Sequence, residues 1–469
     1  MNLTWTFEEI LVATDGVVLS SPKEVFNGVG TDTRADLKGQ IFIALKGETF
    51  DAHNFLPQAI HAGASALVVS EESNQLSNYY KDVSIILVKD TLKALQDMAT
   101  FWRQKLKGQV IAITGSAGKT TTKEFLATLL SSQFETHFSR GSFNNHWGVP
   151  LTLLSCPLTA EKIVVEMGMN HSGEITRLCE IARPDAVMVT MVGSAHIGQF
   201  GSQDELAKAK EEIYESCPKA IQVFNLDNDY TDRMYERRKE DVLPEKMFLF
   251  SSYRKPATVS MRCTEMDFHG MRVMGIIGGV EGEVEIPIFG RQNVVNVMAA
   301  STMAMAVGMT GEAIWKVLPQ VRTTWGRGQI VHLENGTTAL FDAYNANPES
   351  MSALIKSFYE MQVQGKKVAI LGEMLELGTE SDSKHRFLGE TLGNTDIDLV
   401  WFIGPHAKSF EEGIKSSMFE KTYFLSDTYE QGLAKKIGSM LNSNDVVVLK
   451  GSRGMKLEQV LKEWSPIDF

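Results

Sequence analysis

The clearest chemical signal in the sequence is a short glycine loop between a predicted strand and a predicted helix. Residues 110–122 read V-I-A-I-T-G-S-A-G-K-T-T-T, so an apolar run leads to two glycines, then to a lysine and a threonine. Glycines let backbone N–H groups curl around phosphate oxygens, and the helix N-terminus adds partial positive charge. The lysine can reach the outer phosphates, and the threonine hydroxyl can bind Mg²⁺. This P-loop predicts a nucleoside triphosphate site formed by Gly115, Ser116, Ala117, Gly118, Lys119, Thr120 and Thr121.

The P-loop is shorter than the full pattern, which has a glycine where this chain has Ile113. A plain strand-to-helix turn is therefore the alternative interpretation. A metal-bound triphosphate also needs an acidic ligand, normally at the end of a neighbouring strand. Glu166 occupies that place in the predicted strand Ile163–Met167, although a carboxylate can also end a strand without binding metal.

Two lysines in the predicted helix Asp204–Glu215 differ sharply in their surroundings. At 3.6 residues per turn, Lys208 and Lys210 point to nearly opposite sides. The neighbours of Lys208 at i±3 and i±4 are acidic, whereas those of Lys210 are Leu206, Ala207, Ile213 and Tyr214. An ammonium group in an apolar interior is costly and its pKa falls, unless the chain extends to the surface. The neutral amine can add CO₂, so a carbamate at Lys210, able to bind Mg²⁺ through oxygen, is a further hypothesis.

The elements that must position these groups follow an α/β pattern along the whole chain. From Val110 onward, predicted strands alternate with helix-length segments, which favours a parallel sheet covered on both faces. Residues 256–290 predict an antiparallel flap, and Asn293–Val307 predicts a helix bounded by two glycines. A last α/β series has strands predicted at Ala339–Phe341, Lys367–Leu371, Asp398–Ile403, Thr422–Leu425 and Val446–Leu449. We therefore expect three α/β domains, with boundaries near residues 85 and 320.

Composition excludes several classes of protein. The 469 residues carry 46 Lys and Arg against 58 Asp and Glu, a net charge of −12, which argues against general binding to nucleic acid or to anionic membranes. No uncharged apolar run approaches the roughly 20 residues that cross a bilayer, and no signal peptide is apparent. The four cysteines lie far apart and form no CxxC pair, as in reduced proteins. We expect a cytoplasmic protein, and nothing in the sequence demands more than a monomer.

Several stretches, taken in order, resemble the Mur ligases of peptidoglycan synthesis. Their spacing along nearly the whole chain is more specific than any one motif. Besides the P-loop, they are Thr31–Arg34, Phe42–Phe55, Ser142–Asn145, Gly148–Leu153, Glu166–Met169, Ala195–Ser202, Ala207–Lys210, Gly290–Asn293, Gly326–Gly328, Asp342–Pro348, Gly372–Gly378 and Lys450–Arg453. The resemblance implies an N-terminal α/β UDP-binding domain at residues 1–85. It also implies a central P-loop parallel-sheet ATPase domain at 86–319 and a C-terminal Rossmann-like domain at 320–469.

The resemblance also assigns roles to residues at the matching positions. Lys119 would hold the ATP phosphates, and Arg327 the γ-phosphate. Two Mg²⁺ ions are implied, one on Thr120 and Glu166 and the other on His196 and carbamoylated Lys210. Asn293 and Asn296 would face the adenine, and Asp342 the ribose. The residues assigned to the nucleotide-sugar substrate are Thr33, Arg34, Lys46, Asn144 and Asn145.

The implied reaction is an ATP-dependent amide ligation. D-alanyl-D-alanine would be added to UDP-N-acetylmuramoyl-tripeptide through an acyl phosphate, with Lys119, His196 and Lys210 in the catalytic centre. The sequence leaves open whether the third residue of the tripeptide is lysine or diaminopimelate. The nearest alternative is another ligase of the same superfamily, such as folylpolyglutamate synthase. A P-loop switch protein that only binds or hydrolyses nucleotide is an alternative of a different class.

Overall fold

The computed structural model describes residues 3–72, 79, 81–193, 200–253 and 256–467. The chain forms two compact units. Unit 1 comprises Met1–Thr114, Leu130–Met188 and Glu212–Gln222, and unit 2 comprises Gly115–Leu129, Val189–Glu211 and Val223–Phe469. Helices and strands alternate in both units, so the predicted α/β class is confirmed.

Unit 1 begins with a five-stranded sheet in the order β2-β7-β6-β5-β4. Strands β4 to β7 are parallel, whereas β2 is antiparallel to β7. One face is buried because Phe42 and Leu67 of the sheet share an apolar cluster with Leu56 and Ala59 of α2. The elements are β1 (Trp5–Thr6), α1 (Phe7–Thr14), β2 (Val17–Ser20), β3 (Val25–Phe26), β4 (Val29–Gly30), β5 (Ile41–Ile43), η1 (Ala52–Phe55), α2 (Leu56–His61), β6 (Ala66–Val69), β7 (Ser84–Leu87) and α3 (Thr91–Lys105).

A nine-stranded sheet has the order β16-β15-β14-β13-β12-β11-β8-β10-β9. Strands β8, β10 and β9 are parallel, and the apolar run of β8 is buried almost throughout, as expected of a strand covered on both faces. The elements that lie wholly or mainly in unit 1 are β8 (Gln109–Thr114), β9 (Thr136–Phe138), α5 (Gly148–Leu154), β10 (Lys162–Glu166), α6 (Glu174–Ala182) and β11 (Ala186–Val189).

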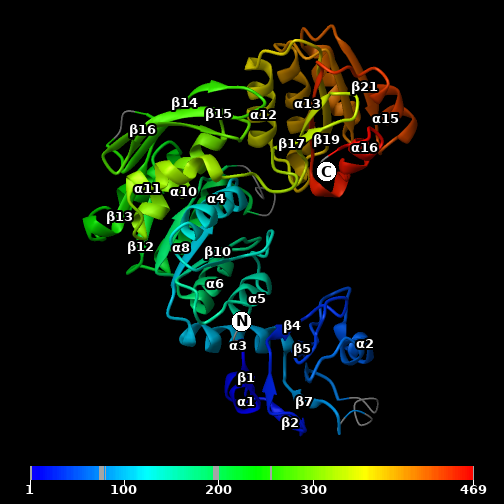
Figure 1. The fold of residues 1–469 in the computed structure, drawn as a ribbon. Coiled ribbons are helices and arrows are strands. Elements are labelled where there is room, and N and C mark those ends of the chain that lie inside the picture. The colour runs from blue at the N-terminus through cyan, green and yellow to red at the C-terminus, as the bar shows by residue number, and fades with distance from the viewer. Residues whose placement is uncertain (1–2, 73–78, 80, 194–199, 254–255, 468–469) are drawn as a thin grey trace. The chain divides into compact units, whose positions relative to one another are not determined.

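Unit 2 contains the helix after the P-loop and the antiparallel strands of this sheet. Strands β14, β15 and β16 pair antiparallel, which confirms the predicted flap; they are the long green strands of Figure 1. Helix α10 starts at Asn293, as predicted. The elements that lie wholly or mainly in this part of unit 2 are α4 (Lys119–Ser131), α8 (Gln203–Glu215), β12 (Ile221–Asn225), α9 (Asp229–Arg238), η3 (Pro244–Lys246), β13 (Met247–Phe250), β14 (Val259–Met266), β15 (Met271–Ile277), β16 (Val280–Ile286), α10 (Asn293–Ala306), α11 (Gly311–Val317) and η4 (Leu318–Gln320).

The rest of unit 2 is built on the C-terminal sheet, whose order is β17-β18-β22-β19-β20-β21. Strand β17 is antiparallel to β18, and the other strands are parallel. The elements are β17 (Gln329–His332), β18 (Thr338–Asp342), α12 (Pro348–Glu360), β19 (Lys367–Gly372), η5 (Gly378–Glu380), α13 (Ser381–Leu392), β20 (Leu399–Ile403), α14 (Ala407–Ser416), β21 (Thr422–Ser426), α15 (Gln431–Gly438), β22 (Val446–Lys450), η6 (Arg453–Met455) and α16 (Glu458–Lys462).

The two faces of the C-terminal sheet carry separate cores, because successive side chains of a strand point to opposite faces. Leu371 and Phe402 share one cluster with α12, α13 and α14, and Phe289, which precedes α10, belongs to it as well. Ile370 and Trp401 share the other cluster with α15 and α16. Figure 1 shows α12 and α13 beside the sheet. Covered on both faces, the sheet leaves the carboxyl ends of its parallel strands as the edge where polar groups can gather.

No described helix combines the length and the apolar character needed to cross a membrane.

Candidate functional site

The P-loop is a tight backbone turn between β8 and α4. Gly115 and Gly118 have φ values of 147° and 80°, which side-chain-bearing residues rarely adopt. A Cβ at Gly115 would lie 1.9 Å from Thr190 Oγ1, and one at Gly118 would lie 2.3 Å from Asn296 Oδ1. Each glycine is therefore required for two reasons: its backbone angles and the close approach of a neighbouring side chain.

The P-loop is held by residues that the sequence did not single out. Thr190, directly after β11, donates its hydroxyl to the carbonyl of Ala117 at 2.6 Å. The backbone N–H of Ser116 donates to the carbonyl of Met191 at 2.8 Å. Asn225, the last residue of β12, donates from Nδ2 to the carbonyl of Thr190 at 2.8 Å. A polar residue at the end of an apolar run was the signal that could have identified Asn225, whereas Thr190 is followed by Met191 and Val192, so the apolar run did not mark it as the end of a strand.

The lysine and threonine that follow the glycines make polar contacts at the loop. Lys119 Nζ donates to the carbonyl of Gly115 at 2.7 Å, so the ammonium group lies over the P-loop. Thr120 Oγ1 accepts a hydrogen bond from Arg327 Nη2 at 3.0 Å, and the Arg327 guanidinium lies 4.3 Å from the ring centroid of Tyr344. The structure thus brings the predicted γ-phosphate arginine to the P-loop, although it lies 207 residues along the chain.

Helix α8 separates its two lysines as predicted. The side chain of Lys208 is 71% exposed and pairs with Glu205 at 2.7 Å, whereas Lys210 is only 2% exposed. Burial, together with the positive charge of Lys119, lowers the pKa of Lys210 well below its usual value. A lowered pKa favours the uncharged amine, which is nucleophilic.

The predicted adenine-side residues form a chain of hydrogen bonds that ends near the P-loop. Asn293 Nδ2 donates to the carbonyl of Phe289 at 2.8 Å, and Asn296 Nδ2 donates to Asn293 Oδ1 at 2.9 Å. Asn296 Oδ1 in turn accepts from the hydroxyl of Thr122 at 3.3 Å. These contacts attach the start of α10 to the first turn of α4.

The predicted ribose residue, Asp342, lies at the carboxyl end of β18. Its Oδ2 accepts from Lys450 Nζ at 2.7 Å. Lys450 ends the adjacent strand β22 and has a side chain only 2% exposed. The pair therefore places a fixed carboxylate at the edge of the C-terminal sheet.

In unit 1 the structure brings together two residues predicted for different roles. Asn144 Nδ2 donates to Glu166 Oε1 at 2.8 Å, and Glu166, which ends β10, is 1% exposed. Asn145 Oδ1 accepts from the N–H of Gly148 at 2.9 Å and so orders the start of α5. A buried carboxylate held by an amide has the hard oxygen donors that divalent cations such as Mg²⁺ prefer.

The two cations predicted for the UDP side, Arg34 and Lys46, are exposed and paired with acidic neighbours. Arg34 makes an ion pair with Asp32 at 2.7 Å, and this hydrogen-bonded pairing lowers the pKa of Asp32 to about 2. Lys46 pairs with Asp51 at 3.2 Å and with Glu71. Thr33 is half-buried beside Arg34. Neither cation lies in an enclosed site.

His196 lies outside the described residues. Within the ranges that are described, no three His, Cys, Asp or Glu side chains are grouped so that they could hold a metal ion.

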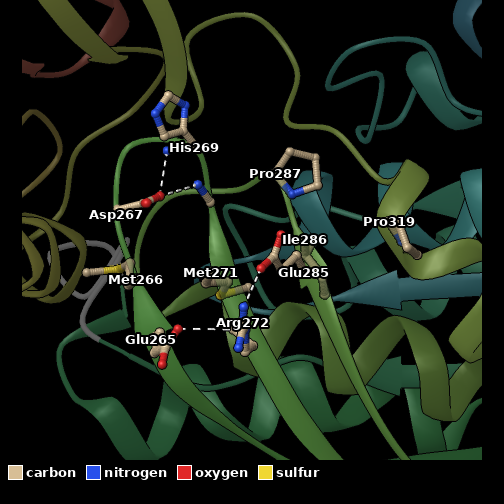
Figure 2. Close-up of a pocket in the computed structure, with 11 residues that line it drawn as sticks. Glu265, Met266, Asp267, His269, Met271, Arg272, Glu285, Ile286, Pro287 and Pro319 are labelled. Atoms are coloured by element: carbon tan, nitrogen blue, oxygen red, sulfur yellow. Dashed lines mark hydrogen bonds and ion pairs between the residues drawn. The ribbon is translucent and has the colours of Figure 1, made fainter.

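A pocket of about 410 Å³ lies in the flap, against Pro319, and its lining includes none of the predicted site residues. Figure 2 shows that its charged groups interact with one another. Arg272 pairs with Glu285 at 2.6 Å and with Glu265 at 3.7 Å, and Asp267 accepts the backbone N–H of His269 at 2.8 Å. Since these charges are already paired, we assign the pocket no part in the chemistry at the P-loop.

Known proteins resemble the chain along nearly its whole length. Three family models match: the Mur ligase family catalytic domain at residues 25–103, the Mur ligase middle domain at 113–304, and the Mur ligase glutamate ligase domain at 326–453. The UDP-N-acetylmuramoyl-tripeptide–D-alanyl-D-alanine ligase of Bacillus subtilis is 35% identical, covering 94% of this chain and 93% of its own. A crystal structure of MurF from Acinetobacter baumannii superimposes with a TM-score of 0.85 at 29% identity, covering 98% of both chains. MurF ligase from Thermotoga maritima, solved in complex with ADP, gives 0.77 at 26% identity, covering 93% of this chain and 96% of its own.

Proposed function

The chain belongs to the Mur ligase family, and from this we propose that it joins D-alanyl-D-alanine to UDP-N-acetylmuramoyl-tripeptide with the use of ATP. The product would be UDP-N-acetylmuramoyl-pentapeptide, a peptidoglycan precursor. The observation that carries the proposal is the Gly115–Thr120 loop, contacted by Arg327, in a chain that matches a ligase of this reaction over 94% of its length. Full-length similarity to such ligases favours this reaction over that of folylpolyglutamate synthase.

The chemistry requires an activated carboxylate, because a carboxylate does not acylate an amine at neutral pH. An oxygen of the tripeptide's terminal carboxylate attacks the γ-phosphorus of ATP, and ADP leaves. The amine of D-alanyl-D-alanine then attacks the acyl carbon, and phosphate leaves with the electron pair of the broken C–O bond. Because two anions meet in the first step, catalysis depends on positioning and on positive charge in a water-poor site.

We propose that Lys119 and Arg327 supply the positive charge at the ATP phosphates. The support is local: Lys119 Nζ lies over the P-loop, and Arg327 already contacts the hydroxyl of Thr120. Asn293 and Asn296 are proposed for the adenine and Asp342 for the ribose. Asp342 accepts a hydrogen bond from Lys450, which would keep its carboxylate oriented for a hydroxyl donor.

The residues proposed for Mg²⁺ supply the hard oxygen donors that this ion prefers. We propose Thr120 and Glu166 for one ion, and His196 with carbamoylated Lys210 for a second. Bound Mg²⁺ would offset the charge of the phosphate oxygens. Lys210 fits the carbamate chemically, because its buried amine has a strongly lowered pKa. The lone pair of the neutral Nζ amine forms a C–N bond to CO₂ and one N–H proton is released, so the neutral side chain becomes an anionic ligand.

The nucleotide-sugar substrate is assigned to unit 1. Thr33, Arg34 and Lys46 are proposed for the UDP part, and Asn144 and Asn145 for the muramoyl part. The exposed side chain of Arg34, 89% accessible, is free to exchange Asp32 for a phosphate oxygen without a large desolvation cost.

We also propose domain boundaries near residues 85 and 320, a cytoplasmic location and a monomeric state. The three matching family models, at 25–103, 113–304 and 326–453, support the boundary near residue 320, which lies between the second and third matches, whereas residue 85 lies inside the first. The location follows from the proposed substrates, because ATP and nucleotide-linked precursors are made in the cytoplasm. Light scattering coupled to size exclusion would measure the oligomeric state.

The proposed function is tested by phosphate release from ATP with each substrate alone and with both. Sustained release that needs both UDP-N-acetylmuramoyl-tripeptide and D-alanyl-D-alanine is the expected result. Release that needs neither would overturn the ligase assignment and favour a nucleotide switch. The same assay with tripeptides ending in lysine and in diaminopimelate identifies which one this enzyme uses.

A further inference from the structure

A histidine–carboxylate pair lies at the carboxyl edge of the C-terminal sheet and has no role in the assignments above. Glu373 directly follows β19, and His406 lies three residues after β20, which is the neighbouring strand. Gly404, with φ of 152°, lets the two loops approach: a Cβ there would lie 2.8 Å from Glu373 Cβ. Ligands of open parallel sheets bind at the carboxyl ends of the strands, so the pair lies where a substrate is expected.

The contact between the two side chains fixes the histidine tautomer. His406 Nδ1 lies 2.6 Å from Glu373 Oε1, and the Glu373 side chain is only 8% exposed. A buried carboxylate accepts a hydrogen bond from Nδ1–H, which leaves Nε2 as the nitrogen that carries the lone pair. The His406 side chain is 26% exposed, so this nitrogen can be reached by a ligand.

Two other titratable groups face His406, both from α13. Asp382 Oδ1 lies 4.0 Å from His406 Nε2 on a side chain that is 80% exposed. The ring of His385 stacks on that of His406, with centroids 4.7 Å apart and planes 7° apart. His385 is fully buried, and its nitrogens are engaged by the N–H of Met374 and the carbonyl of Ser381. Burial lowers the pKa of His385 to about 4, so it is neutral at pH 7 and cannot serve as the base.

The Glu373–His406 pair is also connected by a hydrogen bond to the segment that follows β22. The backbone N–H of Ser452, just after β22, donates to the carbonyl of Glu373 at 3.0 Å. The next residue, Arg453, places its guanidinium 4.4 Å from the ring centroid of Trp325. Trp325 is two residues from Arg327, which contacts Thr120. A continuous set of contacts thus links the pair to the arginine proposed for the γ-phosphate.

We propose that His406, held by Glu373, accepts the proton of the D-alanyl-D-alanine ammonium group before that amine attacks the acyl phosphate. The inference rests on the proposed function and adds the missing base. An α-ammonium group has a pKa of about 8, so most of the dipeptide at pH 7 is protonated and carries no nucleophilic lone pair. The proton passes to His406 Nε2, and the freed lone pair forms the C–N bond. The C–O bond to phosphate breaks with its electrons on phosphate, which takes the second amine proton.

The test compares two nucleophiles in the His406→Gln variant. Hydroxylamine is largely unprotonated at neutral pH, so it needs no base to attack the acyl phosphate. We expect D-alanyl-D-alanine ligation at pH 7 to fall by about 100-fold, the usual scale of general base catalysis, while hydroxamate formation keeps the wild-type rate. The difference between the ligation rates of variant and wild type should shrink above pH 8, because the dipeptide amine is then deprotonated in solution. Glu373→Gln should show a smaller deficit of the same kind, because its amide oxygen still accepts a hydrogen bond from Nδ1–H but is a weaker acceptor than a carboxylate.

The matched control is His332→Gln, at an exposed position of β17, which should leave both rates unchanged. An equal fall in both rates for His406→Gln would mean that the pair only supports the fold, and an unchanged ligation rate would mean that it has no role. Either result overturns the proposal. A wild-type enzyme that forms neither product from UDP-N-acetylmuramoyl-tripeptide would instead contradict the proposed function.

Discussion

At the scale of single residues, Lys210 shows how burial changes the chemistry of an ordinary side chain. Lys208 lies two positions earlier in α8, pairs with Glu205 and remains a surface cation. Lys210 has the same functional group, but desolvation and the nearby charge of Lys119 both disfavour its ammonium form. The same amine is therefore available for covalent chemistry at one position and not at the other.

We expect Lys210→Ala and Lys119→Ala both to lose ligation, but for different reasons. The first would remove an oxygen ligand made by carbamoylation, and a short carboxylic acid added to the assay could replace that ligand. The second would remove a cation at the phosphates, which no acid can replace. Ligation rates measured with and without added acetate or formate separate the two. Near-normal ligation by Lys210→Ala would refute the carbamate assignment.

A second prediction at the scale of single residues concerns Thr190. Its hydroxyl donates to the carbonyl of Ala117, so Thr190→Val would loosen the P-loop without changing side-chain volume. Loss of one such hydrogen bond costs about 1 kcal/mol, and we expect the KM for ATP to rise by roughly five- to tenfold. The KM for D-alanyl-D-alanine should not change. Thr391→Val, at a partly exposed position of α13, removes a hydroxyl that donates to the carbonyl of Phe387 at 2.8 Å and should leave both KM values unchanged. Equal effects of both variants would contradict the assigned role.

At the scale of elements, the C-terminal sheet places its chemistry where its strands end. Asp342 and Lys450 end the adjacent strands β18 and β22, and Glu373 follows the next strand, β19. Helix α13 supports this edge from one side, because its buried His385 binds the N–H of Met374, the residue after Glu373. Fixing α13 against the end of β19 therefore fixes the loop that carries the carboxylate.

This arrangement predicts a pH-dependent weakening of the C-terminal sheet. The pKa of His385 is about 4 in the folded protein and 6.5 when exposed, so the unfolded state binds the proton more readily between these values. The free energy of unfolding should fall as the pH drops from 6.5 to 4, by an amount approaching about 3 kcal/mol.

Urea unfolding followed by circular dichroism at several pH values measures this loss. His385→Gln should show a flatter profile over the same range, because carboxylates titrate equally in both proteins. Identical profiles would show that His385 does not contribute.

The sequence predicts helices and strands more accurately than it predicts the contacts between them. Predicted strands such as Lys367–Leu371 and Val446–Leu449 agree with β19 and β22 to within one residue, because buried parallel strands are continuous apolar runs. The contact of Thr190 with the P-loop, and that of Glu373 with His406, could not be predicted. Each depends on which strands are neighbours, and strand order is not encoded in the local pattern of a single sequence.

At the scale of the whole molecule, order and spacing of motifs carried more information than any one of them. The P-loop alone, with Ile113 in place of a glycine, also fitted a plain turn. Twelve further stretches in a fixed order identified the family, and models of three Mur ligase domains match in the same order. The roles of individual residues, including His196 outside the described ranges, stay predictions that the experiments above address.

Phe289 connects parts of the chain on either side of the predicted boundary at residue 320. It lies in the same buried cluster as Phe358 of α12, and Phe268 stacks on it at 5.9 Å. Close by, Ser357 donates to Gln292 Oε1 at 3.0 Å, and Arg291 pairs with Glu360 at 3.2 Å. A protease that cleaved the chain near residue 320 would therefore break the covalent connection but leave the noncovalent contacts of this buried cluster. The two pieces should co-elute as a noncovalent heterodimer. The C-terminal piece made alone would expose the apolar surface that Phe289 covers.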